Sequence, residues 1–187
     1  MRKIALSLGV AVFFLASVLD LRAGTLAGVT LPDTASVGNK VLVLNGLGLR
    51  TKFMFKIYVA GLYLEQKSSN ADAILKSDSA KRIVMKFLHD ASKKQIEDAF
   101  EESFDGNAPD AKKTMKPEID RLLGALEAVK VGDQMVFTYL PGVGTSLSIN
   151  DQEKVTIATQ AFGPLLFSVW LGPKPPNADL KKGLLGM

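Results

Sequence analysis

The sequence predicts an α+β fold whose sheet is mostly antiparallel. Segments rich in β-branched and aromatic residues form two groups, which are separated by a helical region between residues 92 and 129. Turn residues such as Pro141-Gly142 join neighbouring strand segments directly, as in β-hairpins. Strands that are grouped around helices and connected by hairpins are typical of this fold class.

The first predicted strands lie between residues 41 and 88. Residues 41–44 form a short apolar run, and the dipeptide Asn45-Gly46 after it is typical of a turn. Residues 53–64 are dominated by β-branched and aromatic side chains, which favours a long central strand covered on both faces. Apolar side chains alternate along residues 81–88, so this segment also predicts a strand.

Two helices are expected next. Ser92, with Gln95 three residues later, has the pattern of a capping box at a helix start. Apolar residues then recur at helical spacing as far as Phe104, and residues 106–109 end this helix. A second helix is expected to begin near residue 110 or 115 and to end at Val129.

The C-terminal third predicts a second group of strands followed by helices. The strands are expected over residues 134–140, 145–149 and 153–157. Residues 158–172 then predict a helix, in which Pro164 implies either a kink or a later start. Residues 179–185 predict a short terminal helix.

The N-terminal residues have the order of a secretory signal peptide. Met1 to Lys3 is basic, residues 4–19 carry no charge, and small residues follow. We therefore expect residues 1–27 to be a signal peptide and residues 28–187 to form one domain. Cleavage after Ala27, with the small Thr25 at the −3 position, is preferred to cleavage after Ala23, which has Leu21 there. The protein would then be periplasmic or secreted and would contact a membrane only through this segment. The alternative is an uncleaved anchor, although a membrane span needs about 20 apolar residues.

Composition excludes several kinds of site. The 187 residues include no cysteine and a single histidine, His89, so thiolate chemistry and multi-histidine metal sites are excluded. No phosphate-binding loop or dinucleotide motif is present, and we expect neither a metal nor a cofactor. Without residues 1–23, which hold three basic residues and one acidic residue, the formal net charge falls from +4 to +2. This small charge gives no reason to expect nucleic acid as a partner.

Arg50 and Tyr58 are the candidate binding residues. Arg50 precedes the long apolar segment, and a guanidinium at the mouth of an apolar cleft must stay solvated or bind an anion. A ligand carboxylate or phenolate suits the two parallel donors of arginine, and the Tyr58 hydroxyl could supply another donor. Alternatively, Arg50 is a surface residue and Tyr58 a core aromatic.

The segment from Leu44 to Glu65, which contains both residues, resembles the signature of the chalcone isomerase-like family, in its bacterial secreted branch. Residues 132–137, 161–172 and 179–186 resemble later parts of the family in the same order. The resemblance implies an open-faced β-sandwich, in which a long antiparallel sheet is covered on one face by helices. It also implies a ligand cleft between the sheet and the helices, and Arg50 matches the arginine that the family's enzymes use to cyclise a chalcone.

Other positions depart from the pattern of the family's enzymes. Tyr58 stands where they have a threonine, and Ser92 and Ala99 stand where they have a tyrosine and an asparagine. Losing these polar groups removes most of the stabilisation of a developing enolate. We therefore expect a non-catalytic binder of a fatty acid or similar apolar carboxylate, held by Arg50 and Tyr58 as in the family's fatty-acid binders. The alternatives are an isomerase of the intramolecular lyase type acting on a chalcone-like enone, with Arg50 catalytic, and an envelope protein-interaction module.

Overall fold

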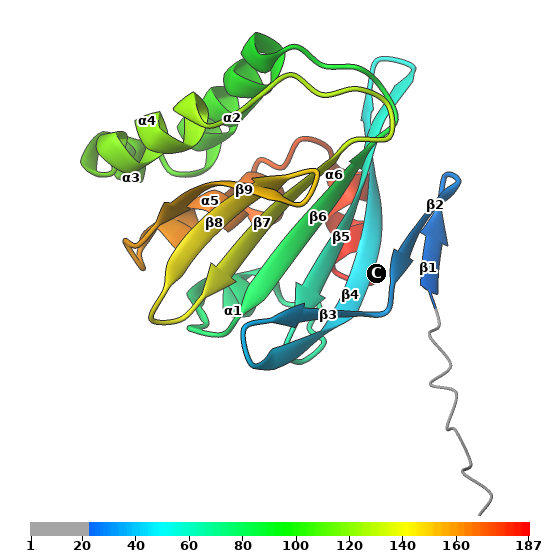
Figure 1. The fold of residues 1–187 in the computed structure, drawn as a ribbon, viewed down its shortest axis with the longest axis horizontal. Helices are drawn as coiled ribbons and strands as arrows, with labels where there is room; N and C mark the ends of the chain where they lie inside the picture. The colour runs from blue at the N-terminus through cyan, green and yellow to red at the C-terminus, as the bar shows by residue number, and fades with distance from the viewer. Residues whose placement is uncertain (1–22) are drawn as a thin grey trace, which may run out of the picture.

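The computed structural model describes residues 23–187 as a seven-stranded antiparallel sheet with helices packed against one face (Figure 1). The strands of the sheet are β3 (Thr34–Val37), β4 (Lys40–Lys52), β5 (Phe55–Leu64), β6 (Lys81–Phe87), β7 (Gln134–Leu140), β8 (Gly144–Ile149) and β9 (Gln152–Ile157). Their order in the sheet is their order in the chain, so every neighbouring pair is also consecutive in the sequence. The predicted α+β fold with a helix-covered antiparallel sheet is confirmed. Of the expected signal peptide, residues 1–27, the first 22 residues lie outside the described residues.

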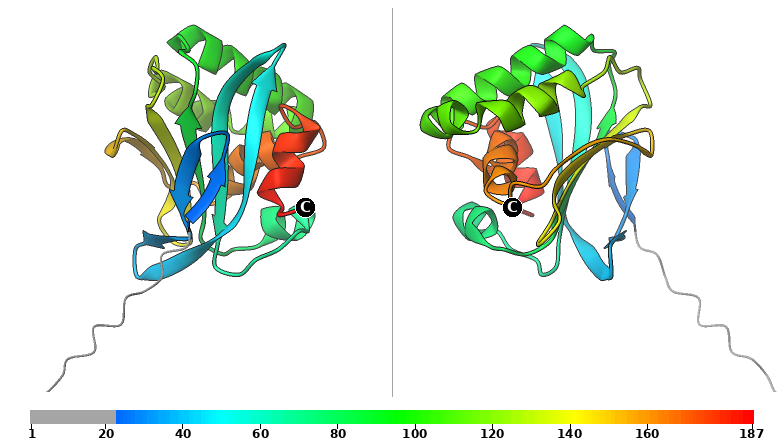
Figure 2. Two further views of the ribbon diagram at one scale, coloured as in Figure 1. Left: turned by 90° about the vertical axis from the view of Figure 1, so that its right-hand side faces the viewer. Right: turned by 60° about the vertical axis from the view of Figure 1, so that its left-hand side comes forward.

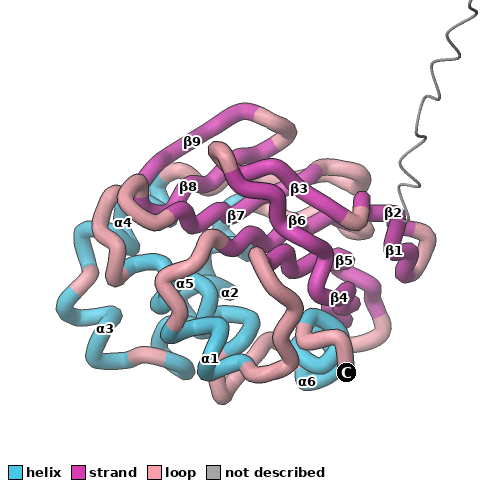
Figure 3. Tube along the Cα trace, turned by 90° about the horizontal axis from the view of Figure 1, so that it is seen from below, coloured by secondary structure: helices cyan, strands magenta, loops and turns pink. Residues whose placement is uncertain are grey.

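The helices form a single layer, which Figure 3 shows on one side of the strands. They are α1 (Ala71–Lys76), α2 (Lys93–Asn107), α3 (Pro109–Thr114), α4 (Lys116–Gly124), α5 (Phe162–Leu171) and α6 (Ala178–Leu184). A two-stranded hairpin of β1 (Ala23–Leu26) and β2 (Val29–Pro32) packs on the opposite face of the sheet (Figure 2). Within residues 23–187, no helix is long and apolar enough to span a membrane.

β5 is covered on both faces, as its composition predicts. Tyr58 and Leu62 belong to the core beneath the helices, whereas Val59 and Tyr63 belong to the smaller core beneath the β1–β2 hairpin. This division follows from the strand period of two, which sends successive side chains to opposite faces. The predicted start of the strand at Phe53 is wrong by two residues, because Phe53 and Met54 form the turn between β4 and β5.

The predicted turn at Asn45-Gly46 is also wrong. β4 continues through both residues, and only an irregularity in its pairing with β5 between Leu44 and Gly46 marks the position. The Asn45 side chain donates to the carbonyl oxygens of Ser68 at 3.0 Å and Leu184 at 2.8 Å. A local turn signal is overridden here because the asparagine has tertiary hydrogen-bond partners.

The capped start of α2 agrees with the prediction, whereas the bounds of the next two predicted helices differ from it. At the start of α2 the Ser92 amide donates to Gln95 Oε1 at 2.8 Å, so the predicted capping box is confirmed. The second predicted helix is divided into α3 and α4, and Val129 lies beyond it, in a bridge with Ala91. α5 begins at Phe162 and holds Pro164 in its first turn, where the missing N–H needs no partner in the helix.

α6 approaches β4 so closely that side chains are excluded from the contact. A Cβ atom at Gly48 would overlap the backbone oxygen of Leu180, and one at Gly183 would overlap the backbone oxygen of Leu47. The Asn45 hydrogen bond to Leu184 lies in the same contact. This close packing fixes the loop that connects α5 to α6.

We expect Gly48→Ala to lower the free energy of unfolding by about 1–3 kcal/mol, because the added methyl group forces α6 away from β4. The matched control is Gly124→Ala at the end of α4, where no atom lies within 4 Å of the new Cβ. This control should raise the free energy of unfolding by about 0.5–1 kcal/mol, since alanine favours a helix. Urea denaturation measures both changes, and equal midpoints would contradict the proposed contact.

Candidate binding site

A cavity of about 500 Å³ lies between the sheet and the helices. This volume is within the range of about 300–1,000 Å³ that is usual for small-molecule sites. Strands β4, β5 and β6 supply one wall, α2 and α5 supply the other, and the α5–α6 loop lies at the rim. Its apolar lining residues are Ile57, Met85, Phe87, Ala91, Ile96, Ala99, Phe100, Val169 and Trp170.

Arg50 and Tyr58 both line this cavity. They are direct partners across the β4–β5 pair, and a shift in the pairing register between Arg50 and Thr51 accounts for their separation of eight residues in the sequence. Partners that lie opposite each other in an antiparallel pair project from the same face of the sheet. The hairpin therefore places a guanidinium and a phenol hydroxyl at one end of an apolar space.

Arg50 is half-buried and has no acidic partner. Its Nη1 donates to the carbonyl oxygens of Thr51 and Pro176, each at 2.7 Å. Within residues 23–187, no carboxylate lies within 4.0 Å of the guanidinium, and Nε and Nη2 donate to no protein acceptor. The two carbonyl contacts orient the side chain but leave its charge without a counter-ion, which favours an anion at the site.

Tyr58 is buried, and its hydroxyl accepts a hydrogen bond from Trp170 Nε1 at 3.2 Å. Burial raises the pKa of Tyr58 to about 12, while the Trp170 N–H and the positive charge of Arg50 act weakly in the opposite direction. The phenol is therefore neutral at ordinary pH. In the described part of the chain its own proton has no acceptor, so the hydroxyl is free to donate into the cavity.

Aromatic rings support the apolar end of the cavity. Trp170 packs edge-on against Phe100, with ring centroids 5.8 Å apart, and at a tilt against Phe137 at 5.3 Å. Tyr58 packs edge-on against Phe87 at 5.7 Å. These contacts fix the indole that holds the Tyr58 hydroxyl, so the position of the donor depends on packing between β5, β6, α2 and α5.

The rim of the cavity carries both basic and acidic side chains, and one of the acidic side chains is paired with a lysine. Lys52 and Lys174 are exposed at the rim together with the acidic residues Asp90 and Glu102. Asp90 accepts from Lys130 Nζ at 2.9 Å, and the same ion pair lowers the pKa of its carboxyl. Within residues 23–187, Arg50 is thus a half-buried cation in the cavity wall that no carboxylate compensates.

Sequence reasoning identified two of the residues that shape the site and missed others. Trp170 fits the apolar pattern of the predicted helix over residues 158–172, and Pro176 lies in the segment after it, so the sequence marks neither as a site residue. Ala99 lines the cavity, whereas Ser92 caps α2 and is not among the lining residues. Pro176 contacts Arg50 across 126 residues of sequence, so no local pattern could have revealed the contact.

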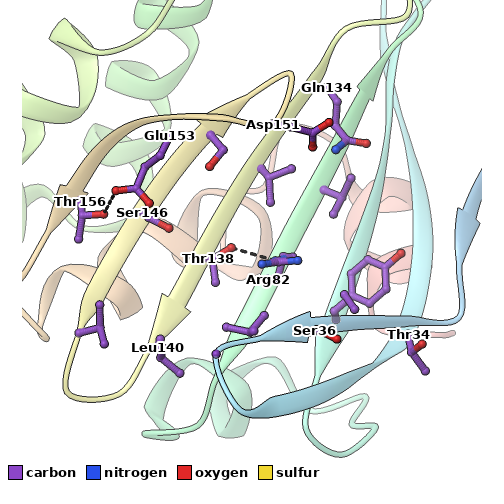
Figure 4. Close-up of a pocket in the computed structure, with 18 of the residues that line it drawn as sticks. Thr34, Ser36, Arg82, Gln134, Thr138, Leu140, Ser146, Asp151, Glu153 and Thr156 are labelled. Carbon is purple, nitrogen blue, oxygen red and sulfur yellow. Dashed lines mark hydrogen bonds between the residues drawn. The ribbon is translucent and has the colours of Figure 1, made fainter.

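A second hollow, of about 600 Å³, lies on the other face of the sheet (Figure 4). Arg82 lines this hollow, and its Nε donates to Thr138 Oγ1 at 2.9 Å. Hydroxyl side chains of β3, β7, β8 and β9 and the carboxylates of Asp151 and Glu153 complete the wall. A polar outer face is usual for an antiparallel sheet that is open to solvent. The cavity beneath the helices is therefore the stronger candidate for an apolar ligand.

We expect a spectrophotometric titration of the folded protein to show little tyrosinate at pH 10. The pKa of each of the three tyrosines is raised to about 12, and burial is the largest cause in each case. Between pH 10 and pH 12 the folded tyrosines keep protons that the unfolded chain releases, so their contribution to the free energy of unfolding falls as pH rises. The denatured protein is the control. A folded-state transition centred near 10 would contradict the burial of these hydroxyls.

Comparisons with known proteins identify the fold and the family of this chain. A search of curated proteins finds no match. A crystal structure of a fatty-acid binding protein of Arabidopsis thaliana has the same fold, with a TM-score of 0.68 at 14% sequence identity. The similarity covers 88% of this chain and 96% of the plant chain. The model of the chalcone isomerase-like family matches residues 23–186, and the chain therefore belongs to the chalcone isomerase-like family.

Proposed function

We propose that the protein binds a fatty acid or similar apolar carboxylate in the cavity between the sheet and the helices. The observation that carries this proposal is the pairing of Arg50 and Tyr58 across β4 and β5, where two free donors face an apolar space. The ligand carboxylate would lie between the guanidinium and the hydroxyl, and the acyl chain would lie along Met85, Ile96 and Trp170. The Arabidopsis protein of the same fold is itself a fatty-acid binding protein, which supports this ligand class.

Estimated contributions to the binding free energy are large enough for a fatty acid to bind in this cavity. Burying ten methylene groups contributes roughly 8 kcal/mol, at about 0.8 kcal/mol for each group. A charge-assisted pair of hydrogen bonds contributes about 1.5–3 kcal/mol. Association costs at least about 4 kcal/mol in lost translational and rotational freedom. The balance is at most about 5.5–7 kcal/mol, which corresponds to a dissociation constant of roughly 10–100 µM.

The two other candidate functions have weaker support in the geometry. An isomerase would use Arg50 for the phenolate and the neutral Tyr58 hydroxyl for the enone oxygen, but Ala99 adds no polar group to the wall. A protein-interaction module without a ligand would favour side chains that fill the space beside Arg50. The cavity instead leaves that space open.

We expect Arg50→Gln to weaken fatty-acid binding by about ten- to a hundredfold, because the substitution removes the charge that pairs with the carboxylate. Tyr58→Phe should weaken it by about three- to tenfold, since a single neutral donor is lost. Arg82→Gln is the matched control, because Arg82 is also half-buried but lies on the opposite face of the sheet. Displacement of a fluorescent fatty acid measures all three affinities.

Two outcomes would contradict this proposal. Equal affinity in Arg50→Gln and the unsubstituted protein would mean that the guanidinium does not hold the carboxylate. Consumption of a chalcone above the rate in buffer, with loss of that rate in Arg50→Gln, would favour the isomerase instead. Native mass spectrometry of the protein from its own host identifies a copurifying acyl ligand directly.

We also propose that the protein belongs to the bacterial secreted branch of the family, is exported to the periplasm or the medium, and loses an N-terminal signal peptide. The sequence pattern of residues 1–23 supports export, and the position of β1 supports cleavage at the early end of the interval from residue 23 to 27. Cleavage after Ala27 would remove β1 (Ala23–Leu26) and its pairing with β2, whereas cleavage after Ala23 would keep most of both.

The intact mass of the exported protein tests this proposal. We expect the mature chain to begin at Gly24, because this start retains the pairs from Gly24↔Leu31 to Leu26↔Val29. A start at Gly28 would be consistent with export but would contradict the argument from β1. A full-length chain that stays with the membrane fraction would contradict the signal peptide and favour an uncleaved anchor.

A further inference from the structure

The turn between β4 and β5 exposes three consecutive large apolar side chains. Phe53, Met54 and Phe55 are 91%, 94% and 59% exposed, although most large apolar residues between 23 and 187 are buried. Phe53 also has a φ of 55°, in the left-handed region that a bulky residue adopts at a cost. Neither exposure nor strained backbone helps this chain to fold, so the Phe-Met-Phe sequence needs another explanation.

The two charged residues that flank these apolar residues along the chain are both positive. Lys52 and Lys56 flank the three residues on the two strands, and both are exposed. From Arg50 to Leu64 the sequence contains no acidic residue, so the end of the hairpin has basic charge and no internal counter-ion. Apolar side chains between lysines are suited to an anionic surface that has an apolar interior. We call residues 52–56 the hairpin tip.

The hairpin tip lies next to the mouth of the cavity. Lys52 belongs both to the tip and to the lining of the cavity, and Arg50 and Ile57 continue the hairpin into the cavity wall. The Phe55 ring stacks on His89, another lining residue, with centroids 5.3 Å apart. Figure 1 shows the β4–β5 hairpin projecting at this end of the sheet.

We propose that the hairpin tip docks the protein on the surface of an anionic lipid bilayer. Phe53 and Met54 enter the boundary between headgroups and acyl chains, while Lys52 and Lys56 bind headgroup phosphates. The tip is too small for a stable protein interface, which buries about 800 Å² on each partner. Two aromatic rings and a flexible thioether on a projecting turn instead suit shallow insertion into lipid. Docking would also turn the cavity mouth toward the bilayer. Any exchange of a ligand between the cavity and the bilayer rests on the proposed fatty-acid binding.

Vesicle sedimentation without added fatty acid tests this proposal. All variants share the N-terminus of the exported protein, and the vesicles contain phosphatidylcholine alone or mixed equally with phosphatidylglycerol. We expect the unsubstituted protein to sediment with the mixed vesicles. The double variant Phe53→Ser/Met54→Ser should bind them at least about tenfold more weakly, because its apolar insertion is lost. Lys52→Gln/Lys56→Gln should lose about fivefold for each lysine and most of the preference for anionic lipid.

The matched control is the double variant Val41→Ser/Val143→Ser. Both valines are exposed, and both lie at the other end of the sheet, Val41 near the start of β4 and Val143 beside the β7–β8 turn. This variant should bind vesicles as the unsubstituted protein does. We expect all variants to have nearly the same urea midpoint as the unsubstituted protein, because the substituted side chains are exposed. This measurement checks that each variant is folded.

Several results would overturn the membrane proposal. The proposal is wrong if the unsubstituted protein sediments with neither kind of vesicle. It is also wrong if Phe53→Ser/Met54→Ser sediments with the mixed vesicles as well as the unsubstituted protein does. A vesicle-free dimer that dissociates in the same variant would show that a second copy covers the tip instead. Fatty-acid titration of Phe53→Ser/Met54→Ser separates the two proposals, because an unchanged affinity with lost sedimentation locates docking in the tip and ligand binding in the cavity.

Discussion

The register between β4 and β5 is the constraint on which the site depends. The two-residue turn at Phe53 and Met54 would by itself place Arg50 opposite Ile57, but an irregularity in the pairing between Arg50 and Thr51 shifts its partner to Tyr58, on the helix-covered face of the sheet. A shift of one residue would move either side chain to the opposite face, since strand side chains alternate. The same short turn places exposed apolar residues next to Arg50. One hairpin therefore supplies the cation of the cavity, its neutral donor and the exposed tip.

The two half-buried arginines show how the surroundings determine what a guanidinium can do. Arg82 shares its hollow with hydroxyls and two carboxylates, and its Nε already donates to Thr138. Within residues 23–187, Arg50 donates hydrogen bonds only to backbone carbonyls, and it lines a cavity whose wall is largely apolar. Carbonyl oxygens orient a guanidinium without neutralising it, and a low dielectric strengthens its attraction for an anion. This contrast is the reason for our proposal that the cavity beneath the helices takes a ligand with one negative group and a long apolar body.

Packing that is remote from the cavity sets the geometry of its polar end. Gly48 and Gly183 let α6 lie directly on β4, and Asn45 ties the end of that helix to the strand. The α5–α6 loop is held between two fixed helices, so the Pro176 carbonyl reaches Arg50. Across the cavity, Trp170 of α5 packs against Phe100 and Phe137 and donates a hydrogen bond to the Tyr58 hydroxyl. The orientation of both donors is a consequence of helix packing rather than of the hairpin alone.

The sequence by itself determined the fold class, most strands, the capping box at Ser92 and the two candidate residues Arg50 and Tyr58, because periodicity, capping and a long family signature are local properties. The turn predicted at Asn45-Gly46 is wrong, because Asn45 bonds to Leu184 and Gly46 packs against the backbone of α6. No local sequence pattern encodes these contacts. Only the tertiary structure decided that Arg50 has no acidic partner among residues 23–187, that Trp170 holds Tyr58, and that a cavity remains between them. These features depend on how side chains distant in sequence fill space, which propensity and spacing do not specify.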